Sequence, residues 1–273
     1  MTSLQLVKHH GLGNDFLIGF HVDLPVPELS EMARRVCDRR RGVGADGLLI
    51  GESHPDASAE MVLFNADGGR AEISGNGLRC FAHALARRRG DPGAVQMTIA
   101  TDAGFRRVEL EPTDDPATMF VTAAMGAVVV IAPPQGWASL GTDPARPAAH
   151  LSVGNPHTVV AVDDLHAVDL DALGRALPEV NLEIVTTGAT ADSISMRVHE
   201  RGVGITEACG TGACAAAVAA SRWGLAAPQD GKLVVQMDGG RASVGIEDDP
   251  AGVTTVSLSG PTTYVATIEY RFR

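Results

Sequence analysis

The chain has 273 residues, of which 45% are hydrophobic and 4% aromatic, and its formal net charge is −11. This length allows two domains of ordinary size, with cores built mainly from aliphatic side chains. The acidic balance argues against a nucleic-acid partner, because a phosphate backbone is bound by clustered Lys and Arg, and no apolar run is long enough to span a membrane.

The first half of the chain predicts strands interrupted by two helices. Residues 27–38 place apolar side chains at helical spacing, with acids early and bases late. Residues 78–86 are largely apolar and predict a central, buried helix, which ends at the basic run 87–89, where cations suit the negative end of a helix dipole. Strand patterns cover residues 4–10, 17–18, 48–50, 60–65, 95–99, 105–110 and 120–124.

The second half repeats this order after a Pro-rich span, residues 133–147, that has no periodicity. We place a domain boundary a little before this span, near Met125-Gly126. The elements expected beyond it are helices over 170–177 and 213–221 and strands over 158–162, 181–185, 194–200, 233–237 and 254–258.

Two landmarks recur in the same order in the two halves. Gly13-Asn14 recurs as Gly154-Asn155, a separation of 154 − 13 = 141, and the turn that starts at Ser74 recurs at Cys209, a separation of 209 − 74 = 135. Similar separations indicate an internal duplication. The fold class expected is therefore α/β (α+β), with two pseudo-symmetric domains, each a mostly antiparallel β shell around a central helix.

The duplicated turns, Ser74-Gly75-Asn76-Gly77 and Cys209-Gly210-Thr211-Gly212, each precede a helix. A helix N-terminus offers unpaired N–H groups and partial positive charge, and two of them facing each other across a cleft could hold one carboxylate. Neutralising that carboxylate acidifies the adjacent Cα–H. A thiol at a helix start has its pKa lowered from about 8.5. With one proton-transfer group on each face, the pattern favours racemisation or epimerisation without a cofactor.

One such turn alone is more simply a strand-to-helix connection whose Gly residues satisfy the backbone angles. The catalytic interpretation depends on the matched pair. The cysteines, Cys37, Cys80, Cys209 and Cys214, form no CxxC pair and no zinc spacing, so we expect thiols in a reducing cytoplasm and no metal site. We expect all of them except Cys209 to be packing residues.

The chain resembles the diaminopimelate epimerases, which interconvert LL- and meso-diaminopimelate without pyridoxal phosphate in lysine and cell-wall synthesis. The resemblance covers nearly the whole length. The segments that carry it are His10-Gly11-Leu12-Gly13-Asn14-Asp15-Phe16, Gly42-Val43-Gly44-Ala45-Asp46-Gly47, Phe64-Asn65-Ala66-Asp67-Gly68, Gly75-Asn76-Gly77, Gly154-Asn155-Pro156-His157, Glu200-Arg201-Gly202 and Ala208-Cys209-Gly210-Thr211-Gly212-Ala213.

This resemblance implies a homodimer of two-domain chains, with the site between the domains, no cofactor, and diaminopimelate as the small-molecule substrate. The segment after Pro261 returns to the first half, so the domains are 1–124 with 261–273, and 125–260. Cys209 is one catalytic acid/base, Ser74 occupies the position of the other, and His157 and Glu200 orient or activate the pair. The resemblance also implies two sets of binding residues. The amino-acid centre of the substrate that does not react is held by Asn14, Asn65, Asn155, Asn181 and Arg201 with Glu200. The reacting carboxylate is held by Gly75, Asn76, Gly210 and Thr211.

Some of these residues also have structural interpretations. Asn14 and Asn155 could cap turns, and His157 could be a satisfied loop residue. A distal ammonium and carboxylate, however, need an acidic group, a guanidinium and neutral amides, and the set contains all three.

Ser74 departs from the family, which carries Cys at this position, and a hydroxyl is a far weaker acid than a thiol. Ser74 is a working natural variant, an engineered change that traps substrate, or the mark of a homologue with lost or altered activity. The alternatives for the function are accordingly another racemase or isomerase of the superfamily, or a catalytically impaired amino-acid-binding homologue. Gly47 and Ile205 also differ from the usual Gln and Glu.

Overall fold

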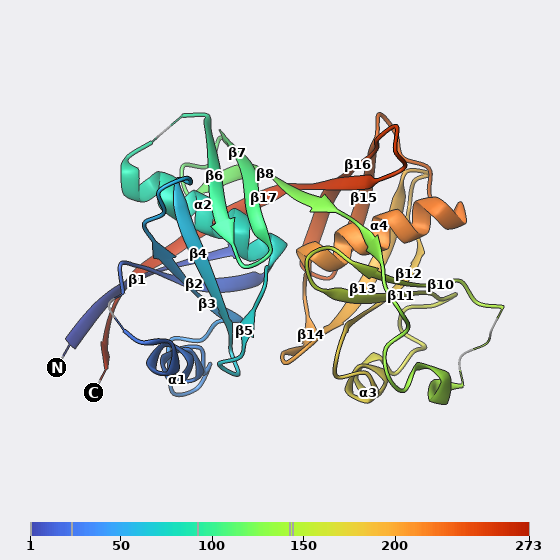
Figure 1. Ribbon diagram of the computed structural model, residues 1–273, viewed down its shortest axis with the longest axis horizontal. Helices are drawn as coiled ribbons and strands as arrows, with labels where there is room; N and C mark the ends of the chain where they lie inside the picture. Colours follow the sequence, from blue (N-terminus) through green and yellow to red (C-terminus); the bar gives the residue numbers. More distant parts are fainter. Residues whose placement is uncertain (1, 23, 92, 142, 144, 273) are drawn as a thin grey trace. The chain divides into compact units, whose positions relative to one another are not determined.

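The computed structural model describes every residue except 1, 23, 92, 142, 144 and 273. Its contacts group the chain into two compact units, whose elements are labelled in Figure 1: unit 1 runs to Ala123 and resumes at Gly260, and unit 2 is Ala124–Ser259. The chain crosses from one unit to the other within β8 (Thr118–Ala127) and again within β17 (Thr254–Phe272).

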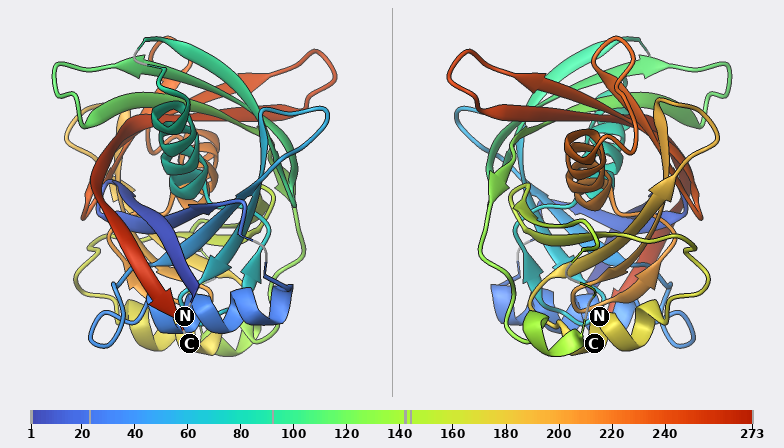
Figure 2. Two further views of the ribbon diagram at one scale, coloured as in Figure 1. Left: turned by 90° about the vertical axis from the view of Figure 1, so that its left-hand side faces the viewer. Right: turned by 90° about the vertical axis from the view of Figure 1, so that its right-hand side faces the viewer.

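Unit 1 is a shell of strands around one helix, α2 (Gly75–Arg89), which is seen inside the shell in the left view of Figure 2. Strands β2 and β3 pair in parallel, as do β4 and β6, and the pairings β1–β2, β3–β4, β4–β5, β6–β7 and β7–β8 are antiparallel. The end of β17 pairs antiparallel with β1. The remaining elements of unit 1 are β1 (Thr2–Gly11), β2 (Asn14–Phe20), α1 (Val26–Val36), β3 (Gly47–Glu52), β4 (Ala59–Asn65), β5 (Arg70–Ala71), β6 (Val95–Thr101) and β7 (Gly104–Pro112).

Unit 2 repeats this topology around α4 (Gly210–Trp223). Strands β11–β12 and β13–β15 pair in parallel, whereas β9–β10, β10–β11, β12–β13, β13–β14, β15–β16 and β16–β17 pair antiparallel. The same sequence of strand directions in both units confirms the predicted duplication. The remaining elements are β9 (Val129–Val130), η1 (Trp137–Leu140), β10 (Ala148–Ser152), β11 (Pro156–Ala161), α3 (Leu170–Ala176), β12 (Asn181–Thr187), β13 (Ser193–Glu200), β14 (Gly204–Thr206), β15 (Lys232–Met237) and β16 (Gly240–Asp248).

The two central helices are buried along most of their length. In α2 every residue from Gly75 to Ala86 is buried, and in α4 every residue from Gly210 to Ala220 is buried. Both helices begin three residues before the positions that the apolar pattern predicts, because a side chain caps each first turn. The basic run 87–89 lies in the last turn of α2, which a left-handed Gly90 terminates with φ of 77°, as the sequence predicted.

The packing cysteines lie where the sequence predicts. Cys37 is 2% exposed and belongs to the apolar core formed around α1, and Cys80 and Cys214 are fully buried in α2 and α4. All four cysteines are free thiols.

Candidate functional site

The two duplicated turns adopt the same local structure, each within its own unit. Ser74 is the N-cap of α2, with φ −129° and ψ 126°, and its Oγ accepts a hydrogen bond of 3.0 Å from the Gly77 N–H. Cys209 is the N-cap of α4, with φ −122° and ψ 116°, and its Sγ accepts from the Gly212 N–H at 3.3 Å. Ser and Cys therefore occupy equivalent positions, each beside the first-turn N–H groups of a buried helix.

The Gly-Asn landmarks also match. Gly13 and Gly154 have φ of 83° and 91°, values that favour glycine, and each precedes an asparagine that starts or approaches the second strand of a hairpin. Asn14 and Asn155 are thereby placed at corresponding hairpin ends, and each asparagine contacts a residue of the first turn of its unit's central helix.

In unit 1, Asn14 and Asn76 form a buried pair. The Asn76 Nδ2 group donates to Asn14 Oδ1 at 3.3 Å, and Asn76 Oδ1 accepts from the Arg79 guanidinium at 2.6 Å. Asn14 Nδ2 in turn donates to Asp46 at 2.9 Å. The amide of Asn76 therefore serves to fix the first turn of α2 against the hairpin, a role for which the sequence contained no signal.

A charged network that sequence reasoning missed supports this hairpin. Asp15 accepts from Lys8 at 2.8 Å and from Arg39 at 2.7 Å, and Arg39 also reaches Asp46 at 2.8 Å. Burial alone would raise the pKa of Asp15, but the Arg39 and Lys8 hydrogen bonds outweigh it and hold that pKa below the usual value. The pKa of Asp46 is raised instead, because burial dominates there.

The other predicted residues of unit 1 lie close to this group. Asn65 ends β4, is half-buried and pairs with Gly47 of β3, and Gly47 pairs with Phe16 of β2. Asn65, Gly47 and Phe16 thus lie side by side on three neighbouring strands, and Phe16 is two residues from Asn14 at the start of β2. Asn65 therefore lies near the same end of the strand shell as Asn14. Gly75 opens α2 directly after Ser74.

In unit 2, a chain of hydrogen bonds runs from β12 to Cys209. The fully buried His157 has its Nδ1 atom 2.7 Å from Glu183 Oε1 and its Nε2 atom 2.9 Å from Asn155 Oδ1. Asn155 Nδ2 donates to Thr211 Oγ1 at 3.3 Å, and Thr211 Oγ1 lies 3.6 Å from Cys209 Sγ. The structure thus brings together four predicted residues and one, Glu183, that was not predicted.

The remaining predicted residues of unit 2 lie at the ends of β12 and β13. Asn181 pairs with His157 in register, its Nδ2 donates to the Pro156 carbonyl at 3.2 Å, and its Oδ1 accepts from the Arg201 N–H at 2.9 Å. Glu200 accepts a hydrogen bond from the Thr206 hydroxyl. Asn181 therefore fixes the backbone that presents Glu200 and Arg201.

Cys209 differs from the expectation in its protonation. Burial raises the pKa of the Cys209 thiol well above its ordinary value, and the Glu200 and Glu183 carboxylates raise it further. Hydrogen bonds from Thr211 and the Gly212 N–H lower the pKa, but by less. The prediction that the helix start lowers this pKa is wrong for the structure, because desolvation and two nearby negative charges outweigh the helix dipole. A raised pKa favours the neutral thiol form of Cys209, the form that carries a proton.

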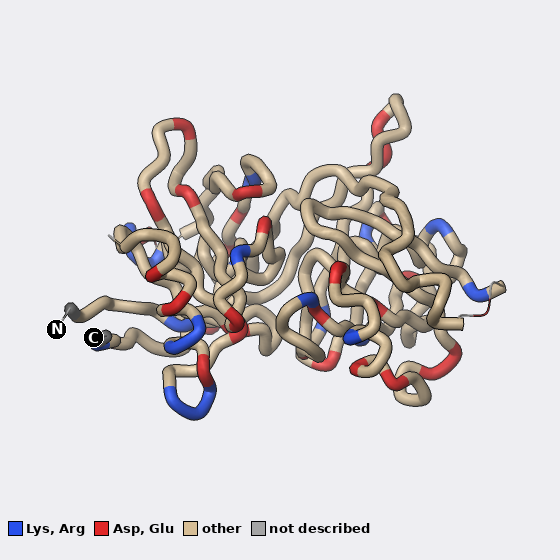
Figure 3. The backbone as a smooth tube through the Cα atoms, turned by 60° about the horizontal axis from the view of Figure 1, so that its bottom comes forward, with Lys and Arg blue, Asp and Glu red and all other residues tan. Residues whose placement is uncertain are grey.

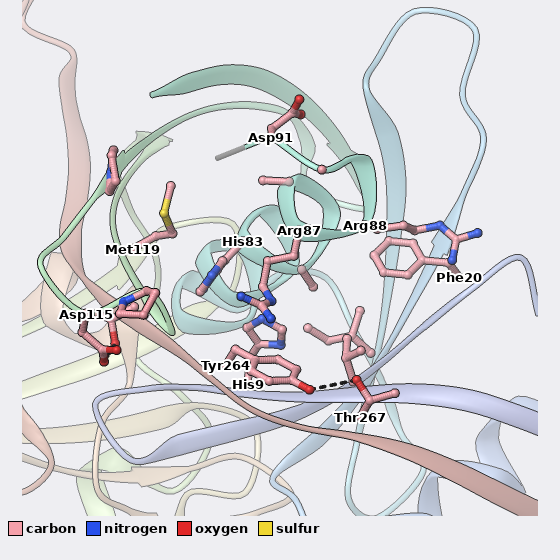
Figure 4. A pocket seen from close by; sticks show the side chains of 18 of the residues that line it. His9, Phe20, His83, Arg87, Arg88, Asp91, Asp115, Met119, Tyr264 and Thr267 are labelled. Carbon is pink, nitrogen blue, oxygen red and sulfur yellow. Dashed lines mark hydrogen bonds between the residues drawn. The ribbon is translucent and has the colours of Figure 1, made fainter. Parts of the chain in front are cut away.

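A separate hollow of about 880 Å³ lies in unit 1 and contains none of the predicted site residues (Figure 4). His9, His83 and Arg87 line it, with the Arg87 guanidinium 4.1 Å from the ring centre of Tyr264. Both ring nitrogens of His9 are buried without a hydrogen-bond partner in the described part of the chain. Burial, together with His83 and Arg87, lowers the pKa of His9 to about 2. His9 is fully buried where it borders the hollow.

Among the described residues, charge and metal-ligand patterns indicate no second site. Figure 3 shows acidic and basic residues interspersed along both units. Within the described ranges, no group of three or more His, Cys, Asp or Glu could hold a metal ion. The helices in those ranges are too short or too polar to cross a membrane.

Solved structures with low sequence identity share this fold. A Bacillus anthracis protein of the phenazine biosynthesis PhzF family superposes with a TM-score of 0.76 at 17% identity, covering 100% of both chains. A hydroxyproline epimerase from Agrobacterium vitis superposes with a TM-score of 0.74 at 14% identity, covering 99% of this chain and 91% of that one. These similarities establish the mixed α+β fold that the sequence predicted.

Sequence comparison identifies the family. The diaminopimelate epimerase of Acidiphilium cryptum is 37% identical in an alignment of 264 residues that covers 89% of this chain and 89% of the relative. That of Rhizorhabdus wittichii is 38% identical over 274 residues, covering 96% of this chain and 93% of the relative. The family model described as diaminopimelate epimerase matches residues 6–131 and 150–265. The chain belongs to the diaminopimelate epimerase family.

Proposed function

We propose that this protein interconverts LL- and meso-diaminopimelate by proton transfer at one α-carbon, without a cofactor. The observation that carries the proposal is the pair of matched helix caps, Ser74 Oγ and Cys209 Sγ, in a chain of this family. Each cap places a proton-transfer atom beside first-turn N–H groups that suit a carboxylate. Inversion of an α-carbon needs one such group on each face.

The reaction divides into two proton transfers. One group removes the α-proton, and the electron pair left on the α-carbon is stabilised as the charge on the neighbouring carboxylate rises. The other group donates its proton to the opposite face of that carbon. The protonated Cys209 thiol suits the donating step, which leaves a thiolate. Ser74, the matching cap of α2, needs a neighbour to take its proton when it acts as a base.

We assign the first turns of the two helices, at Gly75-Asn76 and Gly210-Thr211, to the reacting carboxylate. The distal amino-acid centre is assigned to Asn14, Asn65, Asn155, Asn181, Glu200 and Arg201. A guanidinium complements a carboxylate, a carboxylate complements an ammonium, and neutral amides serve both. His157 and Glu200 orient the groups around Cys209, which agrees with their positions in unit 2.

Independence from pyridoxal phosphate is supported by the lysines. That cofactor is held as a Schiff base on a lysine, and the lysines of this chain are Lys8 and Lys232. The Lys8 ammonium is engaged by Asp15 at 2.8 Å and by the Gly44 carbonyl at 2.6 Å. Lys232 is exposed at the start of β15.

We also propose a cytoplasmic homodimer, built from domains of residues 1–124 with 261–273 and residues 125–260. The four free thiols suit a reducing compartment. The homodimer is proposed from the family to which the chain belongs. Light scattering coupled to size-exclusion chromatography measures the mass, and a monomer at micromolar concentration would contradict the dimer.

Incubation in D2O tests the reaction itself. With LL- or meso-diaminopimelate, we expect deuterium at one α-carbon together with conversion to the other isomer, measured by NMR and chiral chromatography. Tight binding without exchange would identify an amino-acid-binding homologue instead. Turnover of proline or glutamate in preference to diaminopimelate would identify another racemase of the superfamily.

A further inference from the structure

Glu183 occupies an unusual position in β12. It is the only charged residue between Asn181 and Thr187, and its side chain is fully buried. The parallel register pairs Asn181 with His157, so Glu183 lies two residues further along the same face of the strand. From there its Oε1 reaches His157 Nδ1 at 2.7 Å.

The neighbours of His157 fix the direction of its hydrogen bonds. Asn155 donates through Nδ2 to Thr211, which leaves the acceptor Oδ1 facing His157 Nε2. His157 Nε2 must therefore carry a hydrogen. Thr211, accepting from Asn155, has its own hydroxyl hydrogen to donate to Cys209 Sγ at 3.6 Å. In this series of hydrogen bonds, His157 donates to Asn155, Asn155 donates to Thr211, and Thr211 donates to the sulfur of Cys209. This arrangement stabilises a thiolate.

The contact with Glu183 requires one more proton. With Nε2 protonated, a neutral imidazole would turn its Nδ1 lone pair toward a carboxylate oxygen at 2.7 Å, which is repulsive. A proton must lie between Nδ1 and Oε1, as an imidazolium–carboxylate or an imidazole–carboxylic acid pair. Both forms keep Nε2 protonated, and hence keep the donors directed toward Cys209.

The Glu183 carboxyl also contacts the turn that carries Cys209. A Cβ atom at Gly212 would lie 2.5 Å from Glu183 Oε1, so glycine is needed there for the carboxyl to fit. Its other oxygen, Oε2, is buried without a hydrogen-bond partner among the described residues. A buried oxygen without a hydrogen-bond partner destabilises the folded state, which is unusual for a residue with only a packing role.

We propose that Glu183 is a positioning residue that shares one proton with His157 and thereby directs the hydrogen bonds of Asn155 and Thr211 toward Cys209. The proposal rests on the proposed function for its catalytic consequence, since the thiolate is the species left after Cys209 donates its proton. The hydrogen-bond arrangement itself is testable without turnover.

The first test is proton NMR of the full chain with ¹⁵N-labelled histidine. We expect a far-downfield resonance from the proton between His157 Nδ1 and Glu183 Oε1. Glu183→Gln should abolish this resonance. The proposal would be overturned if this resonance is absent from the unmodified protein or persists in Glu183→Gln. If the variant does not fold, the spectrum of the unmodified protein decides.

The second test is kinetic. Glu183→Gln should lower kcat by about tenfold and leave KM within about twofold, since the fully buried Glu183 side chain exposes no surface for a substrate to contact. Glu183→Asp should not restore kcat, because its shorter side chain cannot reach Nδ1. The matched control, Glu179→Gln, changes an exposed residue of the same segment and should have no effect. An unchanged kcat in Glu183→Gln would contradict the positioning role of Glu183. If the unmodified protein catalyses no deuterium exchange, the proposed function is wrong, and the NMR experiment still tests the hydrogen-bond arrangement.

Discussion

Replacing Ser74 with Cys is the most direct test of the duplicated turns. The backbone at Ser74 differs from that at Cys209 by 129 − 122 = 7° in φ and 126 − 116 = 10° in ψ. These differences lie within the ordinary scatter of about 15–20°. A cysteine should therefore be accommodated at position 74 with its sulfur accepting from the Gly77 N–H, as Cys209 accepts from Gly212.

The expected gain follows from the acidity of the new group. Proton transfer by a positioned side chain contributes about 10²–10⁴-fold, and a thiol can be deprotonated near neutral pH whereas a hydroxyl cannot. We expect kcat to rise by about tenfold or more, which is at least about 1.4 kcal/mol of barrier. Sulfur accepts a hydrogen bond less well than oxygen, so we expect the variant to lose about 0.5–1 kcal/mol of stability through the weakened cap.

The assay is the initial rate of deuterium incorporation from D2O, measured under reducing conditions so that the new thiol stays free. Thermal unfolding measured alongside separates the rate from the stability. Ser139→Cys, a change at an exposed position in η1, controls for adding a thiol. An unchanged rate in Ser74→Cys, with the fold intact, would refute the assignment of Ser74 as the weaker proton-transfer partner.

Further predictions concern the thiol, its oxidation and the hollow of unit 1. Burial, and after it the Glu200 carboxylate, raise the pKa of Cys209, so alkylation of this thiol by iodoacetamide should be slow at neutral pH. In Glu200→Gln the alkylation rate, measured by mass spectrometry at the same pH, should increase. An unchanged rate would exclude the Glu200 charge as a cause of the raised pKa. With Ser at position 74, diamide should leave the activity intact, and inactivation through an intramolecular disulfide of Cys209 would contradict this picture. The pKa of His9 falls from 6.5 in the unfolded chain to about 2 in the folded protein. Below pH 6.5 the unfolded state therefore binds a proton that the folded state does not. The free energy of unfolding should fall by up to about 1.4 kcal/mol for each pH unit below 6.5. His9→Phe should flatten this part of the denaturant-measured stability profile, and a profile as steep as that of the unmodified protein would disprove the assignment.

Local patterns allowed the main elements to be predicted. Apolar periodicity marks α1, α2 and α4, and the Gly-rich turns mark the start of the two central helices. The short strands β10 and β14 were missed, because pairing with longer neighbours stabilises them and their own sequences carry little signal. The nine-residue strand β16 was also missed, and it is held by pairing with β15 and β17. The exact starts of α2 and α4 depend on side-chain caps rather than on apolar spacing.

The candidate site was only partly predictable. Ser74, Cys209 and the Gly-Asn loops can be found as repeated local patterns, since the duplication preserves both their order and their spacing. Glu183 left a weaker signal, a single charged residue inside an apolar strand, which could have marked it as a buried functional group.

The sequence by itself determined that two equivalent helix caps exist and that one is a hydroxyl and the other a thiol, because caps are specified by adjacent residues. Only the tertiary structure decided the protonation of Cys209 and its partners. The register of β11 against β12 places Glu183 beside His157, and burial removes the water that would screen their charges. Desolvation and contacts between distant residues have no local pattern, so the fold had to be known before they could be recognised.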